Sequence, residues 1–231
     1  IDASLWFVHA ACDYRKTTGD KVGFQADLAG ACQAIVEGYR RGTRYGIGMD
    51  ADGLIAGGDA STALTWMDAR RDGTVFTPRD GKPVEIQALW YNALLSLAEA
   101  VEERDPARAR ELQLLAAKAG TSIVARYWDP QRGHLADRLE RAEGGGWVPD
   151  WSLRCNQIFA ASLPHSALSV EKRRAVVAVV KQKLLTPMGL RTLEARDPRY
   201  VGRYRGTLFE RDRAYHNGTV WPWLIGPFVV A

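Results

Sequence analysis

The feature that most constrains the fold is the alternation of two kinds of helical segment along the chain. Residues 24–39 carry apolar side chains at spacings of three and four, which is typical of a helix with one face in water. Residues 86–101 are apolar nearly all round, and such a segment has to be buried on most sides. The alternation predicts an all-α fold in which inner helices are covered by outer ones, as in a toroid of helices.

The same two patterns recur and predict about seven helices. The outer, amphipathic helices are expected at residues 24–39, at 106–127 after the cap Asp105, and from Ser169 to before Pro187. The inner helices are expected at residues 5–14, 86–101, 156–163 and 220–230.

Long loops precede the inner helices, at residues 43–84 and 133–154. Loops of this length in a compact domain are usually functional or carry short strands, so we expect minor strand content here. Polar residues gather at the leading ends of the inner helices, where they can converge on one site. No domain boundary is evident, and Ile1 opens directly in an apolar pattern. We therefore expect one incomplete domain, residues 1–231, cut from a longer protein.

Composition excludes several classes of protein. The net charge of +4 is modest and the arginines are interleaved with acids, so we expect no nucleic-acid partner. No apolar run reaches the roughly 20 residues that span a bilayer, so no membrane association is expected. Three widely spaced cysteines predict neither a disulfide framework nor a metal site. They favour a reducing compartment, and we expect a cytoplasmic protein.

Residues 65–92 hold the chemistry of a sugar-binding site. This stretch contains two carboxylates, a lysine, an amide and three large aromatic residues: Asp68, Glu85, Lys82, Asn92, Trp66, Trp90 and Tyr91. Aromatic rings pack on the apolar faces of pyranose rings, and polar groups bind the hydroxyls. A carboxyl beside them can hold a proton at neutral pH and deliver it to a glycosidic oxygen. The alternative is that the aromatic residues only fill the core.

Two carboxylates are needed for glycoside hydrolysis. Asp68 is the preferred acid, because its neighbours Trp66 and Met67 predict an apolar wall that disfavours the charged form. Asp212 or Glu210 is the candidate partner. The alternative for this pair is a solvated charge cluster, since arginines interleave the two acids.

Metal and cofactor motifs are weak throughout. The stretch from Asp50 to Gly53 begins like a calcium loop, but no acid closes it, so Asp50 is expected in a turn or on a sugar hydroxyl. His216 has no nucleophile motif to serve and no paired ligand, so we expect a hydrogen-bonding role. Neither a metal nor a cofactor is predicted.

Five segments together resemble the C-terminal glucosidase domain of glycogen debranching enzymes, of the prokaryotic type. They are residues 2–7, 65–69, 82–92, 153–160 and 215–224, in the expected order. The resemblance implies an (α/α)6 toroid, of which this chain holds about the later half. It also implies inverting, metal-free hydrolysis of single glucose residues at the α-1,6 branch points of glycogen or limit dextrin.

Within that resemblance Asp68 matches the general acid of the family. Eukaryotic relatives carry a glutamate where this chain has Val220, which moves the base role to Asp212, with Glu210 second. The substrate-binding residues are then expected to be Asp2, Trp6, Asp50, Trp66, Lys82, Glu85, Trp90, Asn92, Arg154, Asn156, Gln157, His216, Trp221 and Trp223.

Three other functions fit the same residues. They are a different toroidal glycosidase of the glucoamylase or trehalase kind, a glycan-binding module without catalysis, and a helical scaffold whose aromatic residues only pack. Half a toroid also exposes faces that further helices would cover, so we expect this chain alone to be inactive or prone to aggregation.

Overall fold

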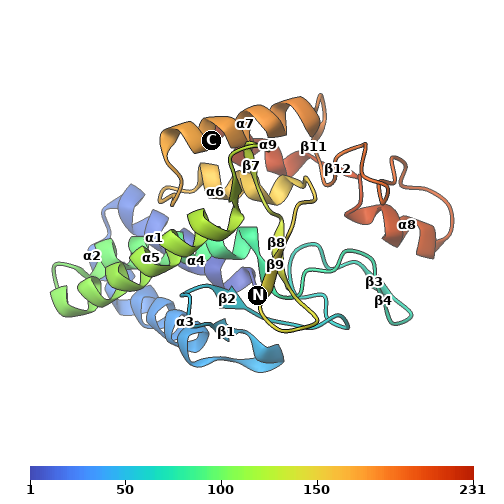
Figure 1. Cartoon of the computed structure of the whole chain (residues 1–231). Helices are drawn as coiled ribbons and strands as arrows, with labels where there is room; N and C mark the ends of the chain where they lie inside the picture. The colour runs from blue at the N-terminus through green and yellow to red at the C-terminus, as the bar shows by residue number, and fades with distance from the viewer.

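The computed structural model describes all residues, 1–231, and is mostly helical (Figure 1). Four helices pack side by side in a row: α1 (Ala3–Thr18), α4 (Val84–Val101), α6 (Ile158–Ser162) and α9 (Ile225–Val230). Three others cover this row: α3 (Ala29–Arg41) packs on α1, α5 (Pro106–Tyr127) on α4, and α7 (Val170–Lys183) on α6. The predicted alternation of inner and outer helices is therefore present.

Local sequence explains where the outer helices begin. The Asp105 side chain accepts a hydrogen bond from the backbone N–H of Arg108, and Pro106 occupies the first turn of α5. Ser169 caps α7 through the N–H of Lys172. The third outer segment starts with the short α2 (Lys21–Gly23) and a π-helical turn, η1 (Phe24–Leu28), before α3. These starts lie where the pattern of caps and apolar residues predicted them.

Two inner helices are shorter than predicted. Residues 155–157 form a 3-10 turn, η3 (Cys155–Gln157), before α6. The last segment begins as a strand, β12 (Val220–Trp221), and a 3-10 turn, η4 (Pro222–Leu224), before α9. The strand pairs with β11 (Gly189–Arg191), which keeps Val220 and Trp221 extended, and Pro222 occupies the first position of the 3-10 turn, so α9 begins only at Ile225.

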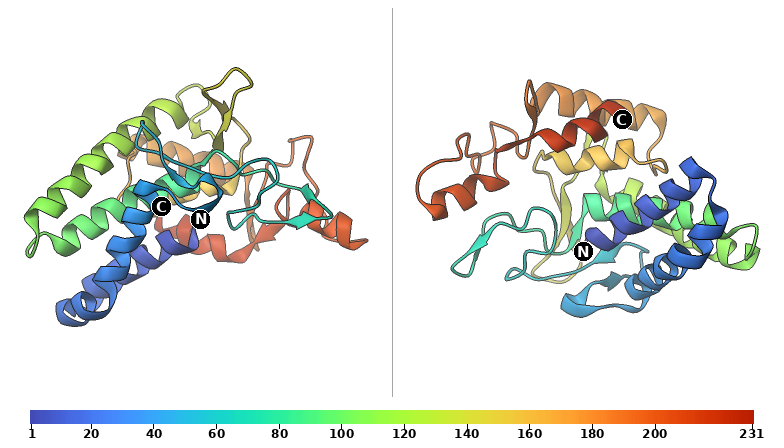
Figure 2. Two further views of the ribbon diagram at one scale, coloured as in Figure 1. Left: turned by 90° about the horizontal axis from the view of Figure 1, so that it is seen from below. Right: turned by 180° about the vertical axis from the view of Figure 1, so that it is seen from behind.

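Burial of the inner row is uneven. Helix α4, in the middle, is buried over nearly its whole circumference. The expectation of burial on most sides is wrong for α1 and α9, which lie at the two ends of the row (Figure 2). Phe7 and Tyr14 of α1 are 40% and 42% exposed, and Val229 and Val230 of α9 are 74% and 72% exposed. Each of these helices has an inner neighbour on one side only. No helix is both long and apolar enough to cross a membrane.

Short antiparallel strands lie in the loops, as expected. They are β1 (Gly48–Met49), β2 (Ile55–Ala56), β3 (Arg70–Arg71), β4 (Thr74–Val75), β5 (Lys82–Pro83), β6 (Trp128–Asp129), β7 (His134–Leu135), β8 (Arg138–Arg141), β9 (Trp147–Asp150), β10 (Leu185–Thr186) and β11. The sheet β5-β8-β9 joins the two long loops at the leading end of α4. Gly81 is essential to this join, because its φ is +88° and a Cβ there would lie 2.2 Å from the Leu139 carbonyl oxygen.

Helix α8 (Leu208–Tyr215) was not predicted. Thr207 and Glu210 form a capping box at its start. The helix projects from the main body beside the hairpin of β3 and β4, which it contacts (Figure 1).

Candidate functional site

Aromatic rings from four parts of the chain meet at the leading ends of the inner helices. We call them the aromatic group: Trp6, Trp66, Phe159, His216, Trp221 and Trp223. Trp66 is central, with its ring edge-on to those of His216, Trp221 and Trp223 at centroid distances of 5.2, 5.9 and 5.1 Å. Such edge-to-face contacts hold the indole ring in one orientation.

The rest of the aromatic group extends from that centre. Phe159 of α6 stacks on Trp223 at 5.6 Å, and Trp6 of α1 lies edge-on to Phe159 at 5.4 Å. Trp223 is 43% exposed, so the group is open to solvent on this side and not enclosed as a pit. The sequence predicted five of these six residues. Phe159 was missed because a single aromatic in an apolar run gives no signal beyond packing.

A buried set of charges lies beneath the aromatic group. We call it the ionic network: Arg79, Glu85, Asp137 and Arg154, whose side chains are at most 4% exposed. Arg79 pairs with both Glu85 and Asp137, and Arg154 Nε lies 3.6 Å from Asp137 Oδ2. Two guanidinium groups thus face two carboxylates, which is the pairing that buried charges require.

Hydrogen bonds connect the ionic network to the aromatic rings. Asn156 Nδ2 donates to Asp137 Oδ1 at 3.0 Å, and Asn156 Oδ1 accepts from Trp66 Nε1 at 2.9 Å. Arg154 donates to the His216 carbonyl at 2.7 Å and to Asn217 Oδ1 at 2.9 Å. The network therefore positions both the central indole and the histidine beside it.

Arg79 and Asp137 were not predicted as site residues. Both lie in the long loops that precede inner helices. Arg79 comes shortly before β5 and Asp137 directly before β8, and these two strands pair with each other. Asp137 directly follows the apolar pair Leu135 and Ala136, both fully buried. An acid in such a run was the one signal that could have found it.

Burial shifts the protonation of two groups at the site. It raises the pKa of Glu85 to about 7, an effect that the charge of Arg79 opposes. Burial, with the nearby charges of Arg154 and Arg79, lowers the pKa of His216 to about 3. His216 is therefore a neutral imidazole at the site, available for packing and hydrogen bonds but not as a cation.

Asp68 does not lie behind an apolar wall. The backbone bends at Thr65 and Trp66; Met67 is fully buried against Asn156, and the Asp68 side chain is exposed. The predicted enclosure is wrong: Met67 and Ala69 are buried, and Asp68 between them is exposed, as alternating side chains of an extended stretch are.

The two candidate partners of Asp68 differ in their surroundings. Asp212 Oδ2 accepts a hydrogen bond from Arg71 Nε at 2.5 Å, which ties α8 to the hairpin that follows Asp68. Glu210 accepts hydrogen bonds from the backbone N–H and the hydroxyl of Thr207 at 2.7 and 2.8 Å. The bond from the backbone N–H is the main reason that the pKa of the exposed Glu210 carboxyl is lowered. Glu210 thus caps its own helix, and Asp212 is the one attached to the Asp68 segment.

Trp90 and Asn92 lie away from the aromatic group. Trp90 is buried, packs on Tyr39 and donates to the Gly53 carbonyl at 3.1 Å. Asn92 lies 3.3 Å from His9 Nδ1 and accepts from the His165 N–H at 3.2 Å. The prediction of sugar contacts is not supported for either. At 1.5 Å per residue they lie roughly 7 and 10 Å further down α4 than Glu85.

Lys82 and Asp50 form a separate charge cluster. The Lys82 ammonium is buried, lies 2.8 Å from carboxylate oxygens of both Asp50 and Asp52, and sits 4.5 Å from the centre of the Trp147 ring. Its donors are thus used within the protein, which argues against the predicted sugar contact. Asp50 keeps 40% of its side chain exposed.

Asp2 and Gln157 support the site from behind. Asp2 caps α1 through the Ala3 N–H at 3.1 Å, and its other oxygen accepts from the Trp66 N–H at 3.2 Å. Gln157 accepts from the Leu135 N–H and donates to the Arg154 carbonyl, both at 3.2 Å. Both residues position neighbouring backbone and leave few groups free for a ligand.

Comparison with known proteins agrees with this arrangement of helices. The chain is 28% identical over 219 aligned residues to the glycogen debranching enzyme of Saccharomyces cerevisiae, which covers 78% of this chain and 14% of that protein. The chain thus spans about a seventh of the length of this curated relative. A solved structure, the rhamnosidase from Klebsiella oxytoca with rhamnose bound, superimposes with a TM-score of 0.54 at 16% identity, over 78% of this chain and 30% of that one.

The family comparison covers every residue. The model of the family described as amylo-alpha-1,6-glucosidase matches residues 1–231, which include the aromatic group, the ionic network and Asp68. The chain belongs to the amylo-alpha-1,6-glucosidase family.

Proposed function

We propose that this chain is part of a glycoside hydrolase that removes single α-1,6-linked glucose residues from branch points of glycogen or limit dextrin. The observation that carries the proposal is the aromatic group. Its central residue, Trp66, is linked through Asn156 to the ionic network and lies two residues before Asp68. Family membership and the name of the yeast relative support the substrate class. The helices are then about half of one (α/α)6 domain.

In this mechanism the aromatic group binds the apolar face of the glucose. Asp68 donates its proton to the glycosidic oxygen, while a second carboxylate removes a proton from water on the opposite face of the ring. Asp212 is the proposed base, with Glu210 second, because the Arg71 contact attaches Asp212 to the Asp68 segment.

The first test replaces Asp68 by Asn in the full-length protein. Glucose release from limit dextrin should fall at least about 10³-fold, while dextrin affinity and thermal stability stay close to wild type, because an exposed side chain is changed. Asp72→Asn is the matched control: this exposed aspartate lies in the next hairpin at φ +48°, which Asn tolerates. Near-normal turnover by Asp68→Asn would remove Asp68 from the mechanism.

The second test compares Asp212→Asn with Glu210→Gln. The first should lose glucose release and regain turnover with azide, an anion that attacks without a base, giving a glucosyl azide of inverted configuration. The second should retain turnover, since its carboxylate only caps α8. The opposite result would assign the base to Glu210, and activity in both variants would place the base elsewhere. NMR of freshly released glucose should show the β-anomer, as inversion requires.

A glycan-binding module without catalysis is the second candidate. The exposure of Asp68 favours it, because no apolar wall encloses the carboxyl that is proposed as the acid. It requires measurable dextrin affinity with no glucose release. Product analysis on branched dextrin, maltose and trehalose separates the proposed activity from that of other toroidal glycosidases. The cytoplasmic location expected from the sequence stays a prediction.

A further inference from the structure

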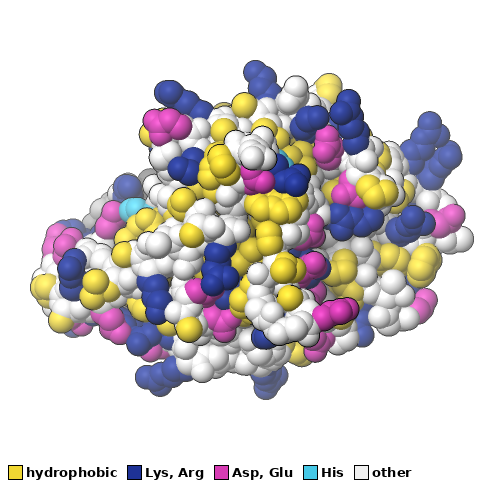
Figure 3. Space-filling model, in the orientation of Figure 1, with side chains coloured by type: hydrophobic (Ala, Val, Ile, Leu, Met, Phe, Trp, Pro, Cys, Tyr) yellow, Lys and Arg dark blue, Asp and Glu magenta, His cyan; other side chains and the backbone are white.

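Most of the net positive charge of the chain lies in one segment, residues 190–215, which we call the arginine arm. It contains seven arginines and four acids, a net charge of +3 against +4 for the whole chain. The arm comprises the last two residues of β11, the loop before α8 and α8 itself. Figure 3 shows dark blue side chains around this end of the molecule, at the right of the view.

The acids of the arm neutralise little of this charge. Glu194 pairs with Lys183 at 3.2 Å and Asp212 with Arg71, both outside the arm. Asp197 pairs with Arg199 at 2.7 Å, and Glu210 is bound by Thr207. The other six arginines have no carboxylate within 4.0 Å; they are Arg191, Arg196, Arg203, Arg205, Arg211 and Arg213.

Three of these unpaired arginines line one cavity. Arg203, Arg205 and Arg213 border an open cavity of about 540 Å³, with Tyr200 on its wall. The single carboxylate in that wall, Glu210, is occupied at Oε2 by both donors of Thr207. The cavity therefore presents three arginines that pair with no carboxylate, beside one carboxylate that is hydrogen-bonded to Thr207.

Aromatic rings connect this cavity to the aromatic group. Tyr204, 48% exposed, lies 5.7 Å from Tyr215 between ring centres. Tyr215 lies 4.7 Å from His216 and 5.0 Å from Trp221. Tyr204 is exposed and Tyr215 and Trp221 are half-buried, so these three rings offer a sugar partly open faces between Trp66 and the arginines.

We propose that the arginine cavity binds a phosphate monoester carried by the glucan. Guanidinium groups present forked donors that match phosphate oxygens in pairs, and a monoester carries about −1.5 to −2 charges at pH 7. The glucan part of this proposal rests on the proposed function, and the phosphate part does not. The site is thus a second subsite that favours phosphorylated over neutral branches.

The experiment measures equilibrium binding of a phosphorylated dextrin and of the same dextrin after phosphatase treatment. Wild type should bind the phosphorylated form at least about tenfold more tightly at low salt, with a smaller difference at high salt. Arg203→Gln/Arg205→Gln should abolish the difference and leave affinity for the neutral dextrin unchanged. Glucose 6-phosphate should compete only weakly, because it lacks the glucan contacts.

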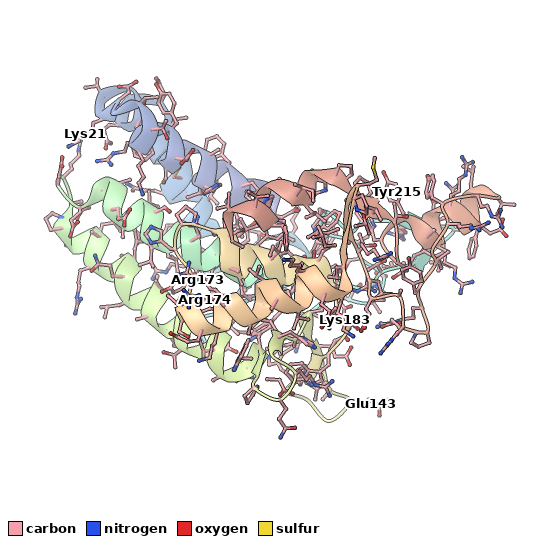
Figure 4. All side chains as sticks on the ribbon, turned by 90° about the horizontal axis from the view of Figure 1, so that it is seen from above. Lys21, Glu143, Arg173, Arg174, Lys183 and Tyr215 are labelled. Atoms are coloured by element: carbon pink, nitrogen blue, oxygen red, sulfur yellow. The ribbon has the colours of Figure 1, made fainter.

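The matched control is Arg110→Gln/Arg174→Gln, which removes two exposed, unpaired arginines of the outer helices α5 and α7. Figure 4 shows Arg174 near the start of α7, at the opposite end from Lys183 and far from Tyr215. This control should keep the preference. A thermal midpoint within about 2 °C of wild type confirms that each variant is folded, as expected for exposed positions.

Equal affinity for the two dextrins, an unchanged preference in the arm variant, or an equal loss in the control would overturn the proposal. Competition by glucose 6-phosphate as strong as that by phosphorylated dextrin would overturn its glucan part. Glucose release from neutral limit dextrin is measured in parallel. A phosphate preference without glucose release refutes the proposed function alone, and glucose release without the preference refutes this inference alone.

Discussion

Removing the charge of Asp137 should strongly destabilise the protein. In the ionic network Asp137 accepts from Arg79 and Asn156 and lies 3.6 Å from Arg154, at 3% exposure. Asp137→Asn keeps the size of the side chain and leaves two buried guanidinium groups opposed by Glu85 alone. Breaking a buried pair by removing one partner costs about 3–5 kcal/mol. That is a large part of the roughly 5–15 kcal/mol by which domains are stable.

One effect offsets part of that cost. The charge of Asp137 is among the causes that raise the pKa of Glu85, so its removal lowers that pKa and makes Glu85 more fully ionised. The remaining carboxylate then neutralises Arg79 better. We therefore expect a loss near the lower end, about 3 kcal/mol at pH 7.

Urea unfolding at pH 7 measures this loss. Asp80→Asn is the control, since Asp80 also pairs with an arginine, Arg138 at 2.7 Å, but its side chain is 21% exposed. Partly exposed pairs contribute about 0–1 kcal/mol. The comparison requires that the unfolding free energy falls with urea concentration at the same slope in both variants. If Asp137→Asn then lost no more stability than Asp80→Asn, the ionic network would not stabilise the fold as we infer.

Three further results are expected. The pKa of His216 is near 3 in the folded protein and about 6.5 in the unfolded chain, so the unfolded chain binds a proton first as the pH falls. The unfolding free energy should therefore fall by up to about 1.4 kcal/mol per pH unit below pH 6.5. Urea titrations of His216→Gln should lack this part of the slope. Glu210→Gln weakens the capping box of α8 and should lower the unfolding free energy by about 0.5–1 kcal/mol with glucose release unchanged; a loss of more than about 2 kcal/mol would contradict a capping role. Trp223→Ala, at a 43% exposed position, should weaken dextrin binding about tenfold or more; unchanged affinity in calorimetry would exclude this ring from the sugar surface.

Helices whose signals are local were predictable from the sequence. Asp105 with Pro106 and Ser169 marked the starts of α5 and α7, because a cap depends only on the next few residues. The start of α9 was not, because it depends on the pairing of Val220 and Trp221 with β11, about thirty residues earlier in the chain. Helix α8 is too short for an apolar period to be visible.

The site was predictable as a set of aromatic residues and less so as a set of charges. Trp66, His216 and Trp221 were expected together because the segments that hold them, residues 65–69 and 215–224, both resemble the same glucosidase family. Asp137 and Arg79 were not, since an ion pair between positions 58 residues apart leaves no periodic trace. The exposure of Asp68 depends on which way one bend turns, and neighbouring apolar residues do not determine that.

The edge-on packing of Trp66 against two other indoles makes the site its own optical probe. Indole emission shifts with the polarity around the ring, and a sugar laid on Trp66 or Trp223 replaces water there. Trp90, sealed in the core and bound to Gly53, supplies a constant background. Titrating unlabelled dextrins against intrinsic fluorescence would therefore report occupancy of the aromatic group directly, even in variants that no longer turn over substrate.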